Sequence, residues 1–329
     1  EHLSSETGQL LGFVDGSQSG SIKNIFQKGD VLFGKLRPYL KKYYQPNFDG
    51  VCSSEIWVLN GKEILNDFLY YLIQTNSFVD LANQSSGSKM PRADWSILEN
   101  GLFSFPNSEE QQKIASFLSL IDERIQTQNK IINDLKTLKI ATAKKIFSGE
   151  LRFKDDNGND FSEWEDKKLG DISIKKSSNI SANTLEENQG NFKIYGANGL
   201  LKEIDFYREE KPYIAIVKDG AGVGRLLLCE GKSSVLGTLD IIKNKEQTDL
   251  LFLYYLLETI DFTKFTTGST IPHIYFKDYS KEIIGLPSFP EQTKIANFLS
   301  SIDSKIDIEN QLLQKLEAQK KYLLQNIFV

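Results

Sequence analysis

The chain has 329 residues, enough for two domains of ordinary size that each bury a core. Hydrophobic residues make up 40% of the sequence and charged residues 25%, and no apolar run approaches the roughly 18 residues that a membrane-spanning helix needs. The formal net charge of -5 argues mildly against a nucleic-acid-binding protein, so a DNA-binding role must rest on where the cations lie.

Cysteine and histidine content gives no sign of a metal site. Cys52 and Cys229 lie far apart, and with the two histidines they form no close-spaced ligand set of the kind that zinc needs. The first residues lack the basic start and apolar stretch of a secretory signal, so we expect a cytoplasmic protein. They also lack an initiator methionine, as a fragment of a longer chain would.

Short apolar runs between turn residues predict the first strands. These runs are Asp30–Gly34 and Glu55–Leu59, and the stretch Asp67–Gln74 that follows has helical character. The alternation indicates a mixed α+β domain.

The stretch Gly34–Tyr44 is the sharpest local feature. It holds four cations and three tyrosines, and no acidic residue occurs from Val31 through Phe48. Such a stretch can neutralise phosphates while its rings pack against sugars or bases. A strand edge with solvated lysines would give the same pattern, so both interpretations stay open. The candidate DNA-binding residues are Lys35, Arg37, Tyr39, Lys41, Lys42 and Tyr43.

A small polar loop, Ser85–Lys89, precedes Met90-Pro91-Arg92. Such loops let backbone amides approach a phosphate, although a plain turn is the commoner interpretation. An arginine is suited to reading guanine, which is worth about 1 to 3 kcal/mol against a wrong base. Ser88, Lys89 and Arg92 are therefore further candidates for DNA binding.

A long helix is predicted over 108–148. Ser108 with Gln111 fits a capping box, and neither proline nor glycine follows before Gly149. About 40 helical residues extend roughly 60 Å. The apolar positions with 4,3 spacing are Ile114, Leu118, Ile121, Ile125, Ile132 and Leu135.

The second half repeats this mixture of signals. Tyr213–Val217, Arg225–Cys229 and Leu239–Ile242 predict strands, and Thr248–Thr259 predicts a helix. The glycine-rich run Asp219–Arg225 lacks the Lys-Ser/Thr pair of a P-loop and leads into a strand, so a hairpin is the better interpretation. No Ser/His/Asp or Cys/His set stands out as catalytic.

The loop Thr266–Thr270 and the following Ile271-Pro272-His273 match the loop before Arg92. His273 is equally well interpreted as a structural residue. The candidate DNA-binding residues of the second half are Lys218, Arg225, Ser269, Thr270 and His273.

Comparing the chain with itself at an offset of 181 residues aligns two long stretches without a gap. Gln111–Asp122 matches Gln292–Asp303, and Phe147 falls on Phe328. Each half is thus a variable part followed by a similar tail. The second tail predicts a helix over 288–329, with Ser288 and Glu291 as its capping box. Its apolar positions are Ile295, Leu299, Ile302, Ile306, Leu313 and Leu316.

The two tails are predicted to pair as an antiparallel coiled coil. The linker Ser148–Glu163 reaches at most about 55 Å, so a parallel pair would stretch it along the whole helix, whereas an antiparallel pair needs only a turn. The variable parts would then lie at opposite ends of the helical pair, related by an approximate two-fold axis. The polar interruptions coincide, Gln128 with Glu309 and Lys139 with Lys320, which would set register at some cost in stability.

The helices either close one intramolecular core and nothing more, or also dock partners on their outer faces. The tails are more apolar than a two-helix seam requires, which favours partners. The residues expected to bind them are Phe117, Phe147, Phe298, Tyr322 and Phe328.

The chain resembles the specificity subunits of type I restriction-modification systems. The resemblance lies in Glu-Glu-Gln-Gln-Lys-Ile-Ala from Glu109, its copy Pro-Glu-Gln-Thr-Lys-Ile-Ala from Pro290, and Gly-Asp-Val-Leu-Phe-Gly-Lys-Leu-Arg-Pro-Tyr-Leu from Gly29. The run Trp164–Asp171 is similar to the opening of a recognition domain. The resemblance covers essentially the whole chain. No counterpart of the Trp164 opening precedes Glu1, so the first domain is expected to lack some N-terminal residues.

This resemblance implies two target-recognition domains, at 1–107 and 149–287, and two spacer helices, at 108–148 and 288–329. Each domain would read one half of a split target in double-stranded DNA, the helices would fix the unread spacer, and two modification subunits would dock on them. S-adenosylmethionine, ATP and magnesium would be bound by the modification and restriction subunits, and this chain would have no cofactor and no turnover. The chain has no Asn-Pro-Pro-aromatic or Asp-Pro-Pro-aromatic motif for gripping a flipped adenine.

Two rival functions differ in what they predict. A coiled-coil scaffold without a DNA role would tolerate reversal of the charges between Lys35 and Lys42. An enzyme with an unfamiliar site, such as a nuclease or methyltransferase, would show turnover when the chain alone is supplied with S-adenosylmethionine and magnesium.

Overall fold

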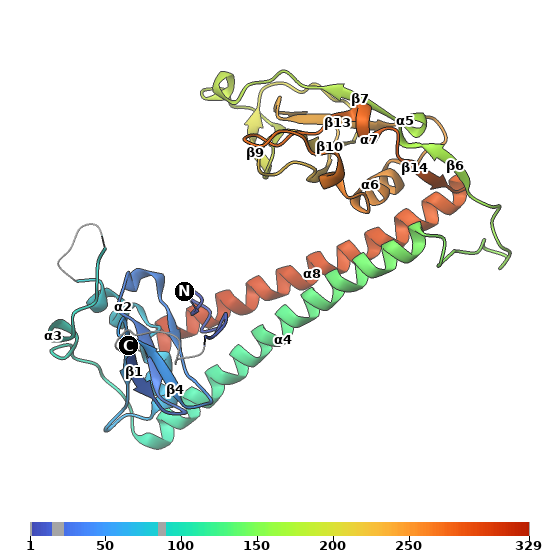
Figure 1. Ribbon diagram of the computed structural model, residues 1–329. Coiled ribbons are helices and arrows are strands. Elements are labelled where there is room, and N and C mark those ends of the chain that lie inside the picture. The colour runs from blue at the N-terminus through green and yellow to red at the C-terminus, as the bar shows by residue number, and fades with distance from the viewer. Residues whose placement is uncertain (1, 15–22, 85–89, 329) are drawn as a thin grey trace. The chain divides into compact units, whose positions relative to one another are not determined.

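The computed structural model describes residues 2–14, 23–84 and 90–328. By its internal contacts the chain divides into two compact units, Glu1–Ile132 with Glu309–Val329, and Asn133–Ile308. Each unit combines a mixed α/β region with about half of each of two long helices, α4 (Ser108–Phe147) and α8 (Phe289–Ile327), which are labelled in Figure 1. Within the described ranges no helix is both long and apolar enough to cross a membrane.

The first unit is built on a three-stranded antiparallel sheet in the order β3-β2-β5. Its central strand β2 is buried because Val31 and Phe33 pack with Ile73 and Phe78 from the helical layer. A separate antiparallel pair joins β1 to β4. The elements are β1 (Lys23–Phe26), β2 (Val31–Gly34), the 3-10 helix η2 (Pro38–Leu40), β3 (Tyr43–Tyr44), β4 (Gly50–Ser53), β5 (Ile56–Leu59), α1 (Asn66–Leu72), α2 (Asn76–Ala82) and α3 (Trp95–Leu98).

The second unit has a four-stranded antiparallel sheet in the order β11-β10-β13-β7, with every residue of the central strand β10 buried. Two smaller sheets, β12-β8-β9 and β14-β6, complete it. The elements are β6 (Glu165–Lys168), α5 (Leu169–Ile172), β7 (Ser173–Ser177), η3 (Ala182–Leu185), β8 (Phe192–Gly196), β9 (Gly199–Ile204), β10 (Tyr213–Val217), β11 (Leu226–Cys229), β12 (Ser234–Val235), β13 (Leu239–Asn244), α6 (Leu250–Glu258), η4 (Phe262–Phe265), α7 (Phe276–Tyr279) and β14 (Ile283–Leu286).

The strands and helices predicted from apolar runs are confirmed. The predicted strands correspond to β2, β5, β10, β11 and β13, and the two short helices correspond to α1 and α6. The run Asp219–Arg225 connects β10 to its antiparallel neighbour β11, so it is the hairpin that the sequence indicated and not a nucleotide loop.

The long helices pair antiparallel within each unit. In the first unit the Lys320 ammonium lies 2.7 Å from the Asp122 carboxylate, and Gln128 Nε2 donates to the Glu309 carbonyl at 3.0 Å. In the second unit the Lys139 ammonium lies 2.8 Å from Asp303. The polar positions that interrupt the apolar stripe therefore make polar contacts between the helices. The predicted 4,3 stripe is confirmed as the packed face, since Leu118 and Leu299 are fully buried.

Both predicted capping boxes are wrong. The first helix is capped by Asn107, whose side-chain oxygen accepts from the Glu110 backbone amide at 3.0 Å, one residue before the predicted Ser108. At the second helix the Ser288 hydroxyl has no hydrogen-bond partner among the described residues, and the Glu291 carboxylate bonds to Arg152 and Trp164.

A repeated glutamine instead binds the N-terminus of a helix in each mixed α/β region, α1 in the first unit and α6 in the second. Gln111 Oε1 accepts from the Leu65 amide, which precedes α1, at 2.8 Å. Its counterpart Gln292 Oε1 accepts from the Asp249 amide, which precedes α6, also at 2.8 Å. The side-chain oxygen of each glutamine accepts a hydrogen bond from an N-terminal amide of the neighbouring helix. Gln111 is therefore not available to form a capping box on its own helix.

Glu291 is the most deeply buried acid of the second unit. Its carboxylate is fully buried, and it accepts from Arg152 Nη2 at 3.0 Å and from Trp164 Nε1 at 3.1 Å. The repeat places Glu110 at the equivalent position of the first tail, and that side chain is exposed. The two glutamates are therefore a matched pair in sequence with opposite burial.

Replacing Glu291 with alanine is expected to destabilise the second unit by about 3 kcal/mol, because Arg152 and the indole of Trp164 would lose their buried acceptor. Urea denaturation of the full chain measures this change. The Glu110→Ala variant is the control, and we expect it to change stability by less than about 0.5 kcal/mol. Equal effects of the two variants would contradict the role assigned to the buried carboxylate.

Candidate nucleic-acid interface

In the first unit two candidate loops meet at the end of the central strand. The Arg37 amide donates to the Pro91 carbonyl at 2.8 Å, and the Ala93 amide donates to the Lys35 carbonyl at 2.9 Å. This backbone pairing brings Lys35, Arg37 and Arg92 together, although they come from opposite ends of the domain sequence.

The second unit repeats this loop pairing. The Gly220 amide donates to the Pro272 carbonyl at 2.9 Å, and the Ile274 amide donates to the Lys218 carbonyl at 3.0 Å. Lys218 and His273 therefore occupy the places of Lys35 and Arg92. We call the two arrangements the first and second loop pairs: Lys35–Arg37 with Pro91–Ala93, and Lys218–Gly220 with Pro272–Ile274.

A strained turn carries the basic run. Arg37 and Lys41, which flank η2, both adopt left-handed backbone conformations, with φ of 52° and 46°. Residues with a side chain adopt this conformation at a cost, which the surrounding hydrogen bonds must offset. The Lys41 amide bonds to the Pro38 carbonyl, and the Lys41 carbonyl accepts from the Glu6 amide. The turn holds Arg37 and Tyr39 exposed to solvent.

Tyr43 does not belong to the exposed set. It is buried in the core of the first unit, and its hydroxyl donates to the Glu6 carbonyl. Burial raises the pKa of Tyr43 well above its usual value, so the phenol stays neutral. We therefore correct its assignment from DNA contact to core packing, because no ring surface is left for a base or sugar.

The other cations of the run are partly exposed. The Lys42 carbonyl accepts a hydrogen bond from the Gly34 amide, and Lys41 Nζ lies 3.5 Å from the Asn76 side-chain oxygen. Their charged ends can still reach a phosphate, because long lysine side chains move at little cost.

The exposed Arg92 side chain forms an ion pair with the half-buried Glu55, at 3.1 Å from Glu55 Oε2. Because the Arg92 end of the pair is open to solvent and such pairs contribute little free energy, a guanine or phosphate can compete for the guanidinium. Sequence reasoning missed Glu55 because it lies far from Arg92 in the chain. The signal was present, since Glu55 directly precedes β5, the strand beside β2.

The cations of the second unit are more heavily engaged. Arg225 Nη1 donates to the Ala197 carbonyl at 2.9 Å and to Asn198 at 2.8 Å. Lys218 Nζ lies 3.6 Å from buried Asp240. The His273 ring packs edge-on against Tyr275, with 4.9 Å between centroids. Asp240 was also missed, although an acid inside the apolar run Leu239–Ile242 is an unusual sequence signal.

The polar loops give a mixed result. Ser88 and Lys89 lie outside the described residues. Ser269 and Thr270 are exposed on a loop that is closed by two backbone hydrogen bonds between Thr267 and His273, of 2.9 and 2.8 Å. The loop is thus a closed turn beside the second loop pair, and its contact with a phosphate stays a prediction.

The expected partner-binding residues separate into two groups. Phe117, Phe298 and Tyr322 are 47%, 38% and 64% exposed on the long helices. Phe147 packs on Phe252 with 5.5 Å between ring centroids, and Phe328 packs on Phe68 at 4.9 Å. The last two rings pack between a long helix and the mixed α/β region of the same unit, so they are less available to a partner.

The family model for the "Type I restriction modification DNA specificity domain" matches residues 11–137 and 161–318. The type I restriction enzyme EcoDI specificity subunit of Escherichia coli is 31% identical over 157 residues, which cover 46% of this chain and 35% of that protein. The type I restriction enzyme MjaVIII specificity subunit of Methanocaldococcus jannaschii is 28% identical over 325 residues, covering 84% of this chain and 76% of its own length.

Two solved structures share the fold. A chain from a type I R-M system, solved in work on complex assembly and conformational transition, matches with a TM-score of 0.63 and 19% identity, covering 99% of this chain and 88% of its own. The type I restriction-modification system S subunit from M. genitalium matches with a TM-score of 0.59 and 19% identity, covering 94% and 84%. At these identities the likeness concerns the fold alone.

Proposed function

Since the chain belongs to the family of type I restriction modification DNA specificity domains, we propose that it selects the DNA sequence on which a type I restriction-modification enzyme acts. Each mixed α/β region reads one half of a split target in double-stranded DNA. The long helices fix the gap between the halves, and the enzyme acts where cellular DNA lies, in the cytoplasm.

The observation that carries this proposal is the duplicated loop pair. In both units a lysine directly after the central buried strand is held by backbone hydrogen bonds beside an arginine or histidine from a distant loop. Cations at these positions can contact phosphates while Arg92 or His273 reaches a base edge. Two such sites on one repeated chain fit a target with two parts.

The net charge of -5 agrees with a chain that binds DNA only together with partner subunits. Acidic groups weaken attraction to the phosphate backbone, so partner subunits would supply most of the phosphate contacts. Two modification subunits would dock on the long helices at Phe117, Phe298 and Tyr322, and restriction subunits would join the full complex. S-adenosylmethionine, ATP and magnesium would be bound by these partners, and this chain would carry no cofactor and transfer no group itself.

Mapping of methylated adenines tests the proposal. The chain is produced together with its modification subunits, and the complex is given unmethylated genomic DNA and S-adenosylmethionine. We expect methylation at a motif of two short half-sites with a fixed unread gap. Modification subunits without this chain, and this chain without them, are the controls and should leave the DNA unmethylated. A continuous motif, or turnover by the chain alone, would contradict the proposal.

A further inference from the structure

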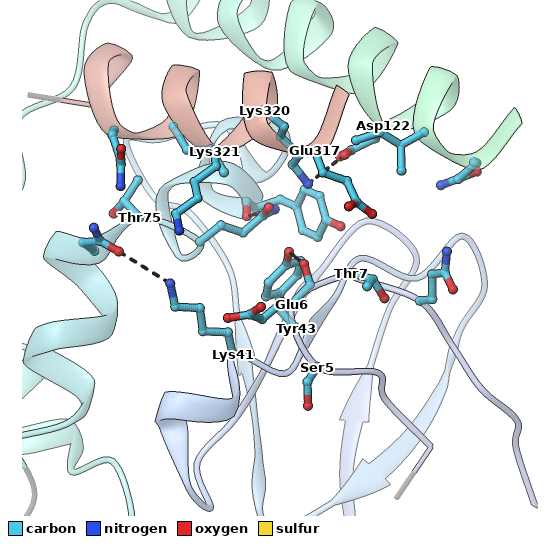
Figure 2. Close-up of a pocket in the computed structure, with 18 of the residues that line it drawn as sticks. Ser5, Glu6, Thr7, Lys41, Tyr43, Thr75, Asp122, Glu317, Lys320 and Lys321 are labelled. Atoms are coloured by element: carbon cyan, nitrogen blue, oxygen red, sulfur yellow. Dashed lines mark hydrogen bonds and ion pairs between the residues drawn. The ribbon is translucent and has the colours of Figure 1, made fainter. Parts of the chain in front are cut away.

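A tyrosine from the recognition domain meets both long helices in the first unit. The Tyr71 hydroxyl, on α1, donates to Asp122 Oδ2 of α4 at 3.0 Å. Lys320 Nζ of α8 lies 2.7 Å from Asp122 Oδ1. Figure 2 shows the Lys320–Asp122 ion pair at the wall of a cavity of about 370 Å³. We call Tyr71, Asp122 and Lys320 the first joint.

The second unit contains the same arrangement. The Tyr255 hydroxyl, on α6, donates to Asp303 Oδ2 of α8 at 2.7 Å, and Lys139 Nζ of α4 lies 2.8 Å from Asp303 Oδ1. In both units the ammonium also lies over the tyrosine ring, 4.9 Å from the centroid for Lys139 and 5.9 Å for Lys320. Tyr255, Asp303 and Lys139 form the second joint.

The two joints are reciprocal in sequence. Asp122 and Asp303 are equivalent in the 181-residue repeat, and so are Lys139 and Lys320. Each joint therefore takes its aspartate from one tail and its lysine from the other. A duplicated tail that pairs with itself antiparallel has to satisfy both contacts at once, so either joint constrains the register of the helices.

Burial of the lysines makes the geometry of these ion pairs important. The side chains of Lys320 and Lys139 are only 12% and 14% exposed. The apolar contacts around them stabilise the helix pair but would persist if one helix shifted along the other. An ion pair with a buried lysine would not, because a shift leaves the lysine charge uncompensated. Buried polar groups of this kind can fix register and orientation at some cost in stability.

The joints differ in one position. Glu258 adds a second carboxylate 2.9 Å from Lys139. Burial acts to lower the pKa of Lys139, but hydrogen bonds to Asp303 and Glu258 outweigh it and raise the pKa. At the matching place after Tyr71 the first unit has Gln74, whose Oε1 has no hydrogen-bond partner among the described residues. The second joint is thus the more strongly charged one.

We propose that Asp122 and Asp303 are positioning residues that fix the direction in which each recognition domain is carried on the helices, and thereby set the number of base pairs between the half-sites. This inference rests on the proposed function. In this inference neither aspartate contacts DNA. Each acts through the tyrosine of the recognition domain that it binds.

The test uses the complex with its modification subunits and duplexes in which both half-sites are fixed and the gap varies by single base pairs. For Asp303→Asn we expect the preference for the native gap over its neighbours to fall about tenfold, since the buried Lys139 ammonium then keeps only Glu258 of α6 and no carboxylate of α8 holds it. The preferred half-site sequences should stay the same. Asp307→Asn, an exposed aspartate one turn further along α8, is the matched control and should keep the wild-type preference.

Rescue separates positioning from folding. Exchanging the charges with Asp303→Lys and Lys139→Asp, together with Glu258→Gln so that the new aspartate faces no second carboxylate, should restore much of the gap preference, because the pair attracts again. Tyr255→Phe removes only the hydroxyl and should relax the preference in a chain that still folds. A variant that melts earlier yet keeps the native gap preference would overturn the inference, as would Tyr255→Phe with wild-type selectivity. Failure of the wild-type complex to methylate any split target would instead refute the proposed function and the inference with it.

Discussion

Deleting one heptad from each long helix is expected to shorten the gap between the two half-sites. The matched deletions are Gln126–Ile132 from α4 and Asp307–Leu313 from α8, which are equivalent in the repeat and leave both joints in place. Seven residues remove about 10.5 Å of helix, which equals about three base pairs of DNA length.

Rotation limits how much of this shortening the complex can use. A heptad leaves the direction of a helical face almost unchanged, whereas each base pair turns the DNA by about 34°. We therefore expect a gap that is shorter by one to about three base pairs, with the half-site sequences unchanged. Methylome sequencing of cells with the shortened chain measures both. An unchanged gap would show that the helices do not act as the ruler.

A one-sided deletion controls for general damage. Removing Gln126–Ile132 from α4 alone displaces Lys139 from Asp303 or Asp122 from Lys320, so at least one joint must break. We expect this chain to unfold at lower urea concentration and to support little methylation. If it behaved like the matched deletion, register between the helices would be unimportant.

Reversing two charges of the first loop pair is expected to abolish most target binding. In the Lys35→Glu, Arg37→Glu variant, two cations that would neutralise phosphates become acids that repel them. We expect the affinity of the assembled complex for its target to fall by about a hundredfold or more, and the slope of log affinity against log salt to flatten by about two. Fluorescence anisotropy with a labelled duplex across a salt series measures both quantities.

Lys62→Glu is the matched control for this reversal. Lys62 is exposed beyond the far end of β5, since Gly34 pairs with Ile56 while Val31 pairs with Leu59. The Lys62→Glu substitution should lower the affinity of the complex for DNA only slightly if the first loop pair is the contact surface. Wild-type binding by the Lys35→Glu, Arg37→Glu variant would favour a coiled-coil scaffold without a DNA role.

The periodic and repeated features were the most predictable from sequence. The 4,3 stripe predicted helices over 108–148 and 288–329, and the structure has them at Ser108–Phe147 and Phe289–Ile327. Buried strands such as Tyr213–Val217 were equally clear, because a short apolar run bounded by turn residues is typical of a strand inside a core. The repeat added the antiparallel pairing, which local propensity cannot supply.

The details that escaped prediction depend on contacts between distant residues. The capping boxes failed because Gln111 and Glu291 bond to Leu65, Arg152 and Trp164, which lie far away in the chain. Tyr43 looked like a surface ring because its neighbours are charged, but the two-residue strand β3 turns it inward. Such choices are made by tertiary packing, which overrides local pattern.

Whether each remaining candidate residue touches DNA stays a prediction. The structure brings Lys35, Arg37 and Arg92 together, but the base that each would read depends on side-chain placement in a groove and on DNA shape. Phe117, Phe298 and Tyr322 likewise remain candidates for partner binding.

The left-handed conformations of Arg37 and Lys41 have a consequence for how tightly DNA can be held. A loop that folding has already fixed loses little further freedom when a ligand arrives, so more of each new contact appears as affinity. Glycine would relieve the strain at both positions, yet it would remove both cations and give the turn more conformational freedom in the free protein. In the proposed complex, the strain at Arg37 and Lys41 would thus lower the stability of the free protein while it raises the affinity for DNA.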